Sequence, residues 1–162
     1  MLDMMGLTFA LTGAALAVFL AGIGSAVGLG IASKSATAVL SEKPERYGIL
    51  MLLVVLPSTQ GIYGFVIGLF VMIKLGIFAG AVVNVTWYQG LQILAACLPV
   101  AFAGWVSAIH QGKTSAAGIM MAAKRPELAF KAGVVFAAMV ELYAILGFLI
   151  SLLIIMLGIK VG

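Results

Sequence analysis

Four long apolar segments account for most of the chain, and each is long enough to cross a membrane. They cover about residues 7–32, 49–77, 88–121 and 128–157, and polar or Pro- and Gly-containing breaks separate them. A spanning helix needs about 20 apolar residues to cross roughly 30 Å of hydrocarbon. Lipid offers the backbone no hydrogen-bond partner, and four strands cannot close a barrel. The pattern therefore predicts an all-α integral membrane protein with four transmembrane helices.

The composition excludes a soluble domain. Hydrophobic residues make up 64% of the chain and charged residues only 9%, whereas a soluble domain carries about 25% charged residues. The basic residues are scattered singly and form no patch of the kind that binds nucleic acid. Four spans occupy the 162 residues as a single membrane domain, 1–162, and leave no room for a catalytic domain. The sequence has no phosphate loop or nucleophile constellation, so we expect no enzymatic activity of the chain alone and no cofactor.

The two halves of the chain repeat each other. At an offset of 82 residues, the aligned pairs are Gly22 with Gly104, Ser25 with Ser107, Pro44 with Pro126 and Glu45 with Glu127. At an offset of 83, they are Gly64 with Gly147 and Phe65 with Phe148. The pattern predicts a tandem duplication of one helical hairpin, over about 7–78 and about 88–160. Since each hairpin has two spans, both copies point the same way, unlike the halves of inverted-repeat transporters. Parallel hairpins favour assembly into a ring.

Small residues recur at every fourth position of the first and third predicted helices. They are Gly22, Ala26 and Gly30 in the first, and Gly104, Ala108 and Gly112 in the third. Such ridges let helix backbones approach closely in lipid, where packing drives association. We therefore expect the first and third helices on a crowded inner ring, with the bulkier second and fourth helices outside.

The charged breaks indicate the orientation in the membrane. The breaks around Pro44 and Pro126 are charged, whereas the one at 80–86 is nearly neutral. Seven basic residues lie toward the charged breaks and only Lys74 and Lys160 toward the other side. Because positive charge favours the cytoplasmic side, both charged loops are predicted to be cytoplasmic and both termini outside the cell membrane.

One acidic residue lies in the middle of a span. Glu141 has no basic residue within a helical turn or two, and a charge at that depth costs at least about 2.5–3.5 kcal/mol. Thr59, Gln60 and Gln111 lie as far from the charged loops as Glu141 does, roughly 20 Å at the rise of a helix. Four polar groups from three helices are thus predicted to share one layer.

Oxygen donors dominate this predicted layer. A carboxylate, two amide carbonyls and a hydroxyl suit a hard cation, while a proton on Glu141 needs only an apolar surround. Pro57 should bend its helix, which allows nearby carbonyls such as that of Leu56 to turn toward an ion. Tyr63 shares a helix face with Thr59 and Gln60 and can bond the carboxylate of Glu141, as an orienting group rather than a ligand.

Three segments, 56–65, 110–113 and 140–148, closely resemble the proteolipid (subunit K, or c) of bacterial V-type ATPases, particularly the sodium-pumping kind. The resemblance covers the whole chain. It implies a rotor ring of identical copies, turned by ATP hydrolysis in a separate soluble head. It also implies a stator membrane subunit with a basic residue, a central shaft seated on the cytoplasmic loops near Pro44 and Pro126, and surrounding lipid.

The same resemblance implies a sodium site. It assigns the ligands to Glu141, Thr59, Gln60, Gln111 and the backbone carbonyl of Leu56, with Tyr63 bonding the carboxylate. At the offset of 83, the counterpart of Glu141 is Ser58, so one hairpin of each chain lacks a carboxylate. We therefore expect one ion per four helices. Fewer ions per turn favour ATP-driven pumping against a steep gradient, because each charge costs about 2.3 kcal/mol per 100 mV.

Two alternatives remain open from the sequence. The same rotor can carry protons, in which case Thr59, Gln60 and Gln111 serve helix packing. In a different class, a small multidrug or ion antiporter can also place one Glu in a four-helix chain. Antiporters of this kind typically have antiparallel halves, which would put the two charged loops on opposite faces of the membrane.

Overall fold

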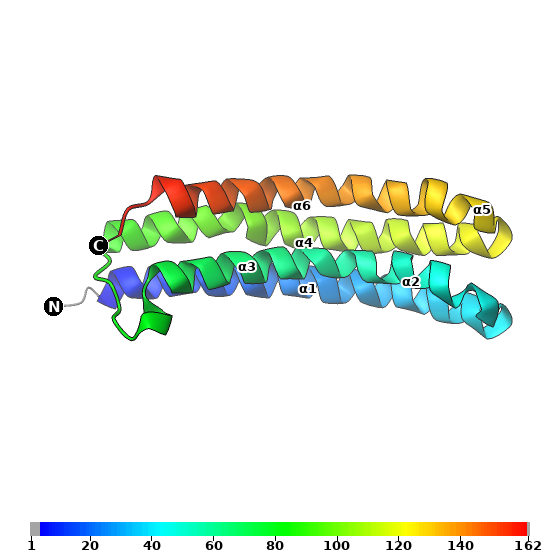
Figure 1. The fold of residues 1–162 in the computed structure, drawn as a ribbon, viewed down its shortest axis with the longest axis horizontal. Helices are drawn as coiled ribbons and strands as arrows, with labels where there is room; N and C mark the ends of the chain where they lie inside the picture. Colours follow the sequence, from blue (N-terminus) through cyan, green and yellow to red (C-terminus); the bar gives the residue numbers. More distant parts are fainter. Residues whose placement is uncertain (1–3, 162) are drawn as a thin grey trace.

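The computed structural model is a long bundle of four antiparallel spans, described over residues 4–161 (Figure 1). The spans are Met4–Glu42, Pro44–Lys74, Trp87–Lys124 and Pro126–Gly158, and each is long and apolar enough to cross a membrane. Both termini lie at one end of the bundle, and the two charged turns lie together at the other (Figure 1). The predicted all-α fold with four transmembrane helices is confirmed. The two charged turns share one end, as expected of two hairpins that point the same way.

Two spans are continuous helices and two are composite. The first and third are α1 (Met4–Glu42) and α4 (Trp87–Lys124). The second consists of η1 (Pro44–Arg46), α2 (Tyr47–Val55), η2 (Leu56–Ser58) and α3 (Thr59–Lys74). The fourth consists of α5 (Pro126–Leu128), η4 (Ala129–Val134), α6 (Val135–Leu153) and η5 (Ile154–Gly158). A short helix, η3 (Ile77–Ala79), lies in the connection between the hairpins.

The helices run further toward the charged end than the apolar pattern predicts. α1 continues to Glu42, and only Lys43 separates it from the next helix. Beyond the lipid, water solvates polar side chains, so they do not end the helix. Pro44 and Pro126 each begin the following helix, at a position where proline loses no hydrogen bond. Lys43 Nζ donates to the carbonyl of Ala123 at 2.6 Å, and Arg46 Nη1 to that of Ala122 at 3.1 Å. Two cations at the start of the second span thus satisfy carbonyls in the last turn of α4.

α1 and α4 pack with their backbones in direct contact. A Cβ on Gly28 would collide with the carbonyl of Ala108, and a Cβ on Gly112 would collide with Gly28. The predicted ridge of α4 is buried in this contact. In its contact with α4 within the chain, α1 uses Gly24 and Gly28. Its predicted ridge, Gly22, Ala26 and Gly30, lies on a different face of the helix, which the small-residue spacing cannot distinguish.

A π-helix explains why the repeat offset changes from 82 to 83. η4 (Ala129–Val134) lies in the second hairpin between the pairs that align at 82 and those that align at 83. A π-turn is the usual way in which an α-helix absorbs one inserted residue without rotating the residues beyond it. The first hairpin has no π-helix at this place and continues as α2. The π-turn that accommodates the extra residue of the second hairpin therefore precedes Glu141 in the chain.

Candidate functional site

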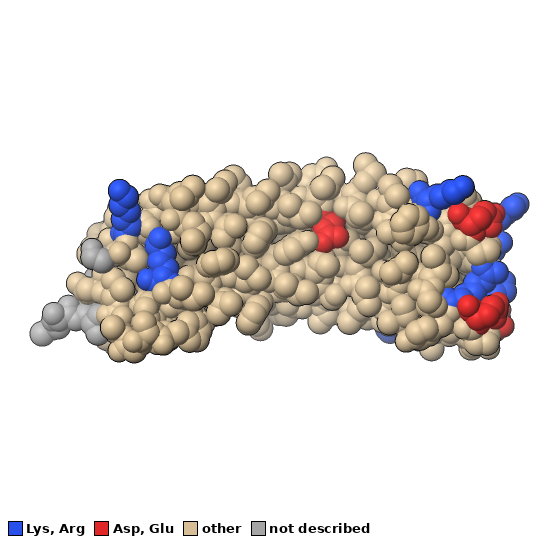
Figure 2. Space-filling view, in the orientation of Figure 1, with Lys and Arg blue, Asp and Glu red and all other residues tan. Residues whose placement is uncertain are grey.

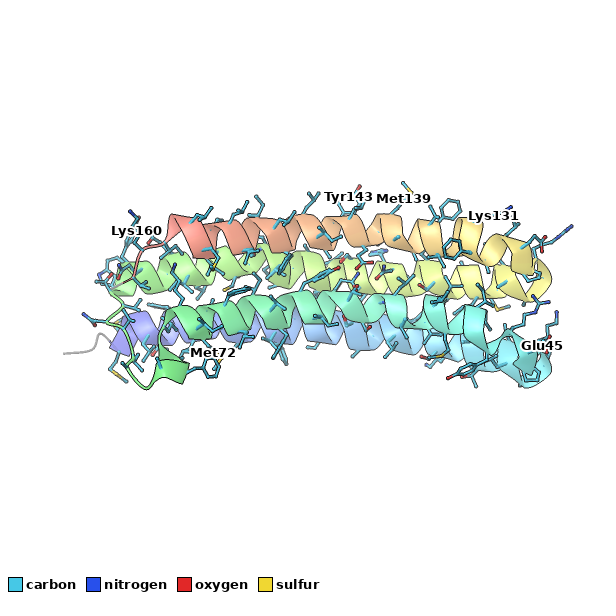
Figure 3. All side chains as sticks on the ribbon, in the orientation of Figure 1. Glu45, Met72, Lys131, Met139, Tyr143 and Lys160 are labelled. Atoms are coloured by element: carbon cyan, nitrogen blue, oxygen red, sulfur yellow. The ribbon has the colours of Figure 1, made fainter. Side chains whose placement is uncertain are left out.

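Glu141 lies midway along the bundle, far from the basic side chains that the structure describes. Figure 2 shows one acidic patch in the middle of this face and basic side chains at the two ends. Within residues 4–161, ion pairs join Arg46 to Glu45 and Arg125 to Glu127, and none involves Glu141. Its side chain is partly exposed, on the flank of α6 that faces α3 and α4. The outer flank of α6 is apolar or aromatic, with Met139 and Tyr143 projecting away from the bundle (Figure 3).

Two side chains from two other helices hold the carboxylate. The hydroxyl of Tyr63 on α3 donates to Oε1 of Glu141 at 2.7 Å. Nε2 of Gln111 on α4 donates to Oε2 at 3.3 Å. The expected bond between Tyr63 and Glu141 is present. Because both carboxylate oxygens accept a bond, the orientation of the group is determined by α3 and α4 as well as by α6.

A pair of fully buried amides lies behind the carboxylate. Gln60 and Gln111 are both 0% exposed. Nε2 of Gln60 donates to Oε1 of Gln111 at 2.6 Å, and Nε2 of Gln111 also donates to the carbonyl of Ala137 at 3.0 Å. Buried amides that form such a network are costly to leave unpaired. The two glutamines therefore connect the second, third and fourth spans at the depth of Glu141.

The turn at Pro57 positions the two remaining predicted groups, the Thr59 hydroxyl and the Leu56 carbonyl. η2 is a single 3-10 turn that contains Pro57, and it replaces the α-helical bond that proline cannot make. The Leu56 carbonyl accepts the Thr59 hydroxyl at 3.0 Å, and that hydroxyl lies 3.4 Å from Oε1 of Gln60. The five predicted residues and Tyr63 thus form one connected cluster. The cluster offers carboxylate, amide, hydroxyl and carbonyl oxygen, which are ligands for hard cations.

Ser25, which is not among the predicted site residues, also belongs to this neighbourhood. Its hydroxyl accepts the backbone N–H of Gly61 at 2.8 Å, directly after Thr59 and Gln60. This bond anchors the start of α3 to α1 just beyond the proline turn. A signal was available, since a serine within a close-packed membrane helix usually bonds a neighbouring helix.

Because only the second hairpin contains the π-helix η4, we expect single-residue deletions in the two hairpins to have different effects on the site. Deleting Ala132 from η4 should convert the π-turn into a regular α-helix and leave Glu141 beside Tyr63. Deleting Met51 from α2, which has no π-turn, should rotate Thr59 and Gln60 by about 100°.

The measurement is the thermal midpoint of the detergent-solubilised protein. The Ala132 deletion should leave it nearly unchanged. The Met51 deletion should lower it by roughly 5–10 °C, because about three side-chain hydrogen bonds of ~1 kcal/mol each are lost. Equal losses for the two deletions would contradict the assignment of η4 as the inserted residue.

Two stretches of the chain, residues 12–71 and 94–154, each match the family model of the ATP synthase C subunit. The stretches begin 82 residues apart and end 83 apart, so the duplication found in the sequence corresponds to two copies of one family unit. The chain belongs to the ATP synthase C-subunit family. The predicted resemblance is confirmed, and with four apolar helices this family member is a multi-pass membrane protein.

Two relatives of this chain are K subunits of V-type and A-type complexes. The V-type sodium ATPase subunit K of Enterococcus hirae is 48% identical over 151 residues, which are 93% of this chain and 92% of that protein. The A-type ATP synthase subunit K of Methanocaldococcus jannaschii is 37% identical over 141 residues, which are 87% of this chain and 59% of that protein. Both are K subunits of ATPase or ATP synthase complexes. Like them, this chain is a non-catalytic membrane subunit of such a complex.

Proposed function

We propose that this chain is the rotor subunit of a rotary V-type ATPase that binds one Na⁺ at Glu141 and carries it across the membrane during ATP-driven rotation. The observation that supports the proposal most strongly is the mid-span carboxylate, bonded on both oxygens by Tyr63 and Gln111. The ligands are Glu141, Thr59, Gln60, Gln111 and the carbonyl of Leu56. Tyr63 orients the carboxylate.

The ligand chemistry favours sodium over a proton. A proton on Glu141 needs no second oxygen donor, whereas a hard monovalent cation needs several. Two fully buried glutamines at this depth add amide oxygens beside the carboxylate, for which a proton site has no use. The name of the Enterococcus hirae relative, a sodium ATPase subunit, supports the same ion.

Charge neutralisation explains how the loaded site passes lipid. No basic side chain in residues 4–161 pairs with Glu141, so a bare carboxylate facing lipid would be costly. A bound Na⁺ compensates this charge and makes the site neutral as the ring turns. Release then requires a competing positive charge, which a stator subunit with a basic residue supplies.

The first hairpin carries no ion in this mechanism. Ser58, the counterpart of Glu141, donates its hydroxyl to the carbonyl of Val55 at 2.5 Å on its own helix. One Na⁺ per four helices means few ions per revolution, and each can be moved against a steeper gradient. The charged turns at Pro44 and Pro126 face the cytoplasm and seat the central shaft, and both termini lie outside.

Carbodiimide labelling of the detergent-solubilised ring tests the ion directly. The reagent modifies a protonated carboxyl, and mass spectrometry locates the product on Glu141. We expect millimolar Na⁺ to block labelling, because the bound ion keeps the carboxylate ionised and covered. Labelling that responds to pH but not to Na⁺ would contradict the sodium assignment and indicate a proton rotor.

A further inference from the structure

One buried serine differs from the others in its hydrogen bonding. Within residues 4–161, the buried serines are Ser25, Ser107, Ser115 and Ser151. The hydroxyls of Ser25, Ser107 and Ser151 each bond a backbone N–H or a backbone carbonyl. The hydroxyl of Ser115 is fully buried and has no hydrogen-bond partner in the part of the chain that the structure describes. A buried hydroxyl without a partner is costly, so it requires an explanation.

Ser115 faces the second span at its proline turn. Three residues further along α4, a Cβ on Gly118 would lie 3.4 Å from the side chain of Leu53. Four residues earlier, Gln111 accepts a hydrogen bond from Gln60, at the start of α3. Since each residue turns the helix by about 100°, Ser115 lies within about 60° of both contacts around the axis of α4. It is therefore level with the stretch between Leu53 and Gln60, which contains η2.

The second span has a carbonyl without its helical donor in this stretch. Because proline has no N–H, Pro57 cannot donate to the carbonyl of Leu53, its acceptor in a regular α-helix. The side-chain hydroxyls of the turn donate to the carbonyls of Val55 and Leu56 and not to that of Leu53. In membrane helices, serine side chains and ordered waters satisfy carbonyls that a proline has freed. The Leu53 carbonyl therefore needs a donor at the level of the Ser115 hydroxyl.

We infer that one water molecule binds between the hydroxyl of Ser115 and the backbone carbonyl of Leu53. Ser115 makes no direct bond to the second span, and a water can connect two polar groups that lie too far apart to bond each other. The water accepts the hydrogen of the Ser115 hydroxyl and donates one of its own to the Leu53 carbonyl. It joins α4 to the second span about one helical turn closer to the charged turns than Gln111.

The water restrains the turn that carries two of the proposed ion ligands. The Leu56 carbonyl and the Thr59 hydroxyl belong to this turn and bond each other at 3.0 Å. Leu53 lies one turn before Leu56, and Ser115 lies one turn after Gln111. The bridge therefore holds the proline turn at a constant distance from Gln111. This makes Ser115 a positioning residue for Na⁺, an effect that rests on the proposed function, whereas the water site itself does not.

Replacing Ser115 with alanine removes one end of the bridge. We expect the thermal midpoint of the detergent-solubilised protein to fall by about 2–6 °C, because the Leu53 carbonyl loses its donor. The matched control is Ser107→Ala, at the same distance from Gln111 on the other side. Its hydroxyl bonds only the Gly104 carbonyl of its own helix, at 3.4 Å, so the midpoint should be nearly unchanged. An unchanged midpoint in Ser115→Ala would overturn the inference.

A Pro57→Ala background tests whether Leu53 is the partner. Alanine has an N–H and returns the helical donor to the Leu53 carbonyl. Ser115→Ala should then lower the midpoint little further, so the effects of the two changes are not additive. Equal losses in both backgrounds would show that the water does not bind Leu53 and would overturn the inference.

A structure of the unmodified ring that resolves ordered water is an independent measurement. We expect a water within about 2.6–3.2 Å of both Oγ of Ser115 and the carbonyl oxygen of Leu53. The alternative is that the Ser115 hydroxyl bonds the carbonyl of Gln111 on its own helix, as serines in helices often do. That bond, with no water present, would overturn the inference.

Carbodiimide labelling measures the effect of the bridge on the ion. Ser115→Ala should raise the Na⁺ concentration that protects Glu141 by about 3–10-fold, and Ser107→Ala should leave it unchanged. If Ser115→Ala does not shift the protection, the positioning role is wrong. If Na⁺ does not protect Glu141 in the unmodified ring, the proposed function is wrong. The thermal midpoints and the resolved water then still decide whether the bridge exists.

Discussion

Replacing Glu141 with glutamine is expected to reduce ATP-driven sodium uptake to background. Glutamine has nearly the same shape and still accepts the hydrogen bond of Tyr63 at the position of Oε1. It carries no charge, so a cation at this depth loses its only counter-charge. Uptake of radioactive sodium by the reconstituted complex measures the effect, and carbodiimide labelling of the ring should also disappear.

The matched control is Glu127→Gln. Glu127 is half-exposed at the charged turn and pairs weakly with Arg125 at 3.9 Å. An exposed pair of this kind contributes little, so in the isolated ring this variant should keep the carbodiimide labelling of Glu141 and its block by Na⁺, a measurement that does not involve the shaft. Sodium uptake that survives in Glu141→Gln would exclude Glu141 as the carrier.

Replacing Gln111 with leucine is expected to raise the sodium concentration that protects Glu141 by about 10–100-fold, since a hydrogen bond to a charged group is worth roughly 1.5–3 kcal/mol. The change removes the Gln111 bond to Glu141 and leaves the amide of Gln60 without its partner. Protection from carbodiimide labelling as a function of Na⁺ concentration measures the shift.

Gln89→Leu is the matched control because it makes the same substitution in the same helix. Gln89 forms the capping box of α4 with Thr86 and also donates to the carbonyl of Lys160 at 2.9 Å. Its loss should lower stability by about 1 kcal/mol and leave the sodium dependence of labelling unchanged. If both variants shift the sodium dependence equally, Gln111 acts through stability and is not a ligand.

The depth of each polar residue could be predicted from the sequence because the rise of a helix is constant. Counting from the charged turns places Glu141, Gln60 and Gln111 in one layer, and the structure connects them by hydrogen bonds. Comparison of the two halves at a fixed offset predicted the duplication, and the two family matches begin and end at the same offsets. The change of offset was also visible in the sequence, but its cause was not. Only the structure shows η4 as the turn that absorbs the extra residue.

The direction in which a helix face points was not predictable. The small-residue spacing singled out Gly22, Ala26 and Gly30 on α1, whereas Gly24 and Gly28 make its contact with α4 within the chain. In water, the apolar side of a helix marks the face that is buried. In a membrane helix every side is apolar, because lipid is as apolar as leucine. Small residues then occur on faces for different partners, and spacing alone cannot assign them.

The sequence by itself determined the four spans, their parallel duplication, the depth of Glu141 and the family, because these depend on apolar length, helix rise and residue identity. The tertiary structure decided which face of α1 meets α4, that Ser25 anchors the start of α3, and that Tyr63 and Gln111 bond opposite oxygens of Glu141. These depend on the rotation of each helix about its axis. That rotation is set by backbone contact between neighbouring helices and leaves no pattern along a single chain.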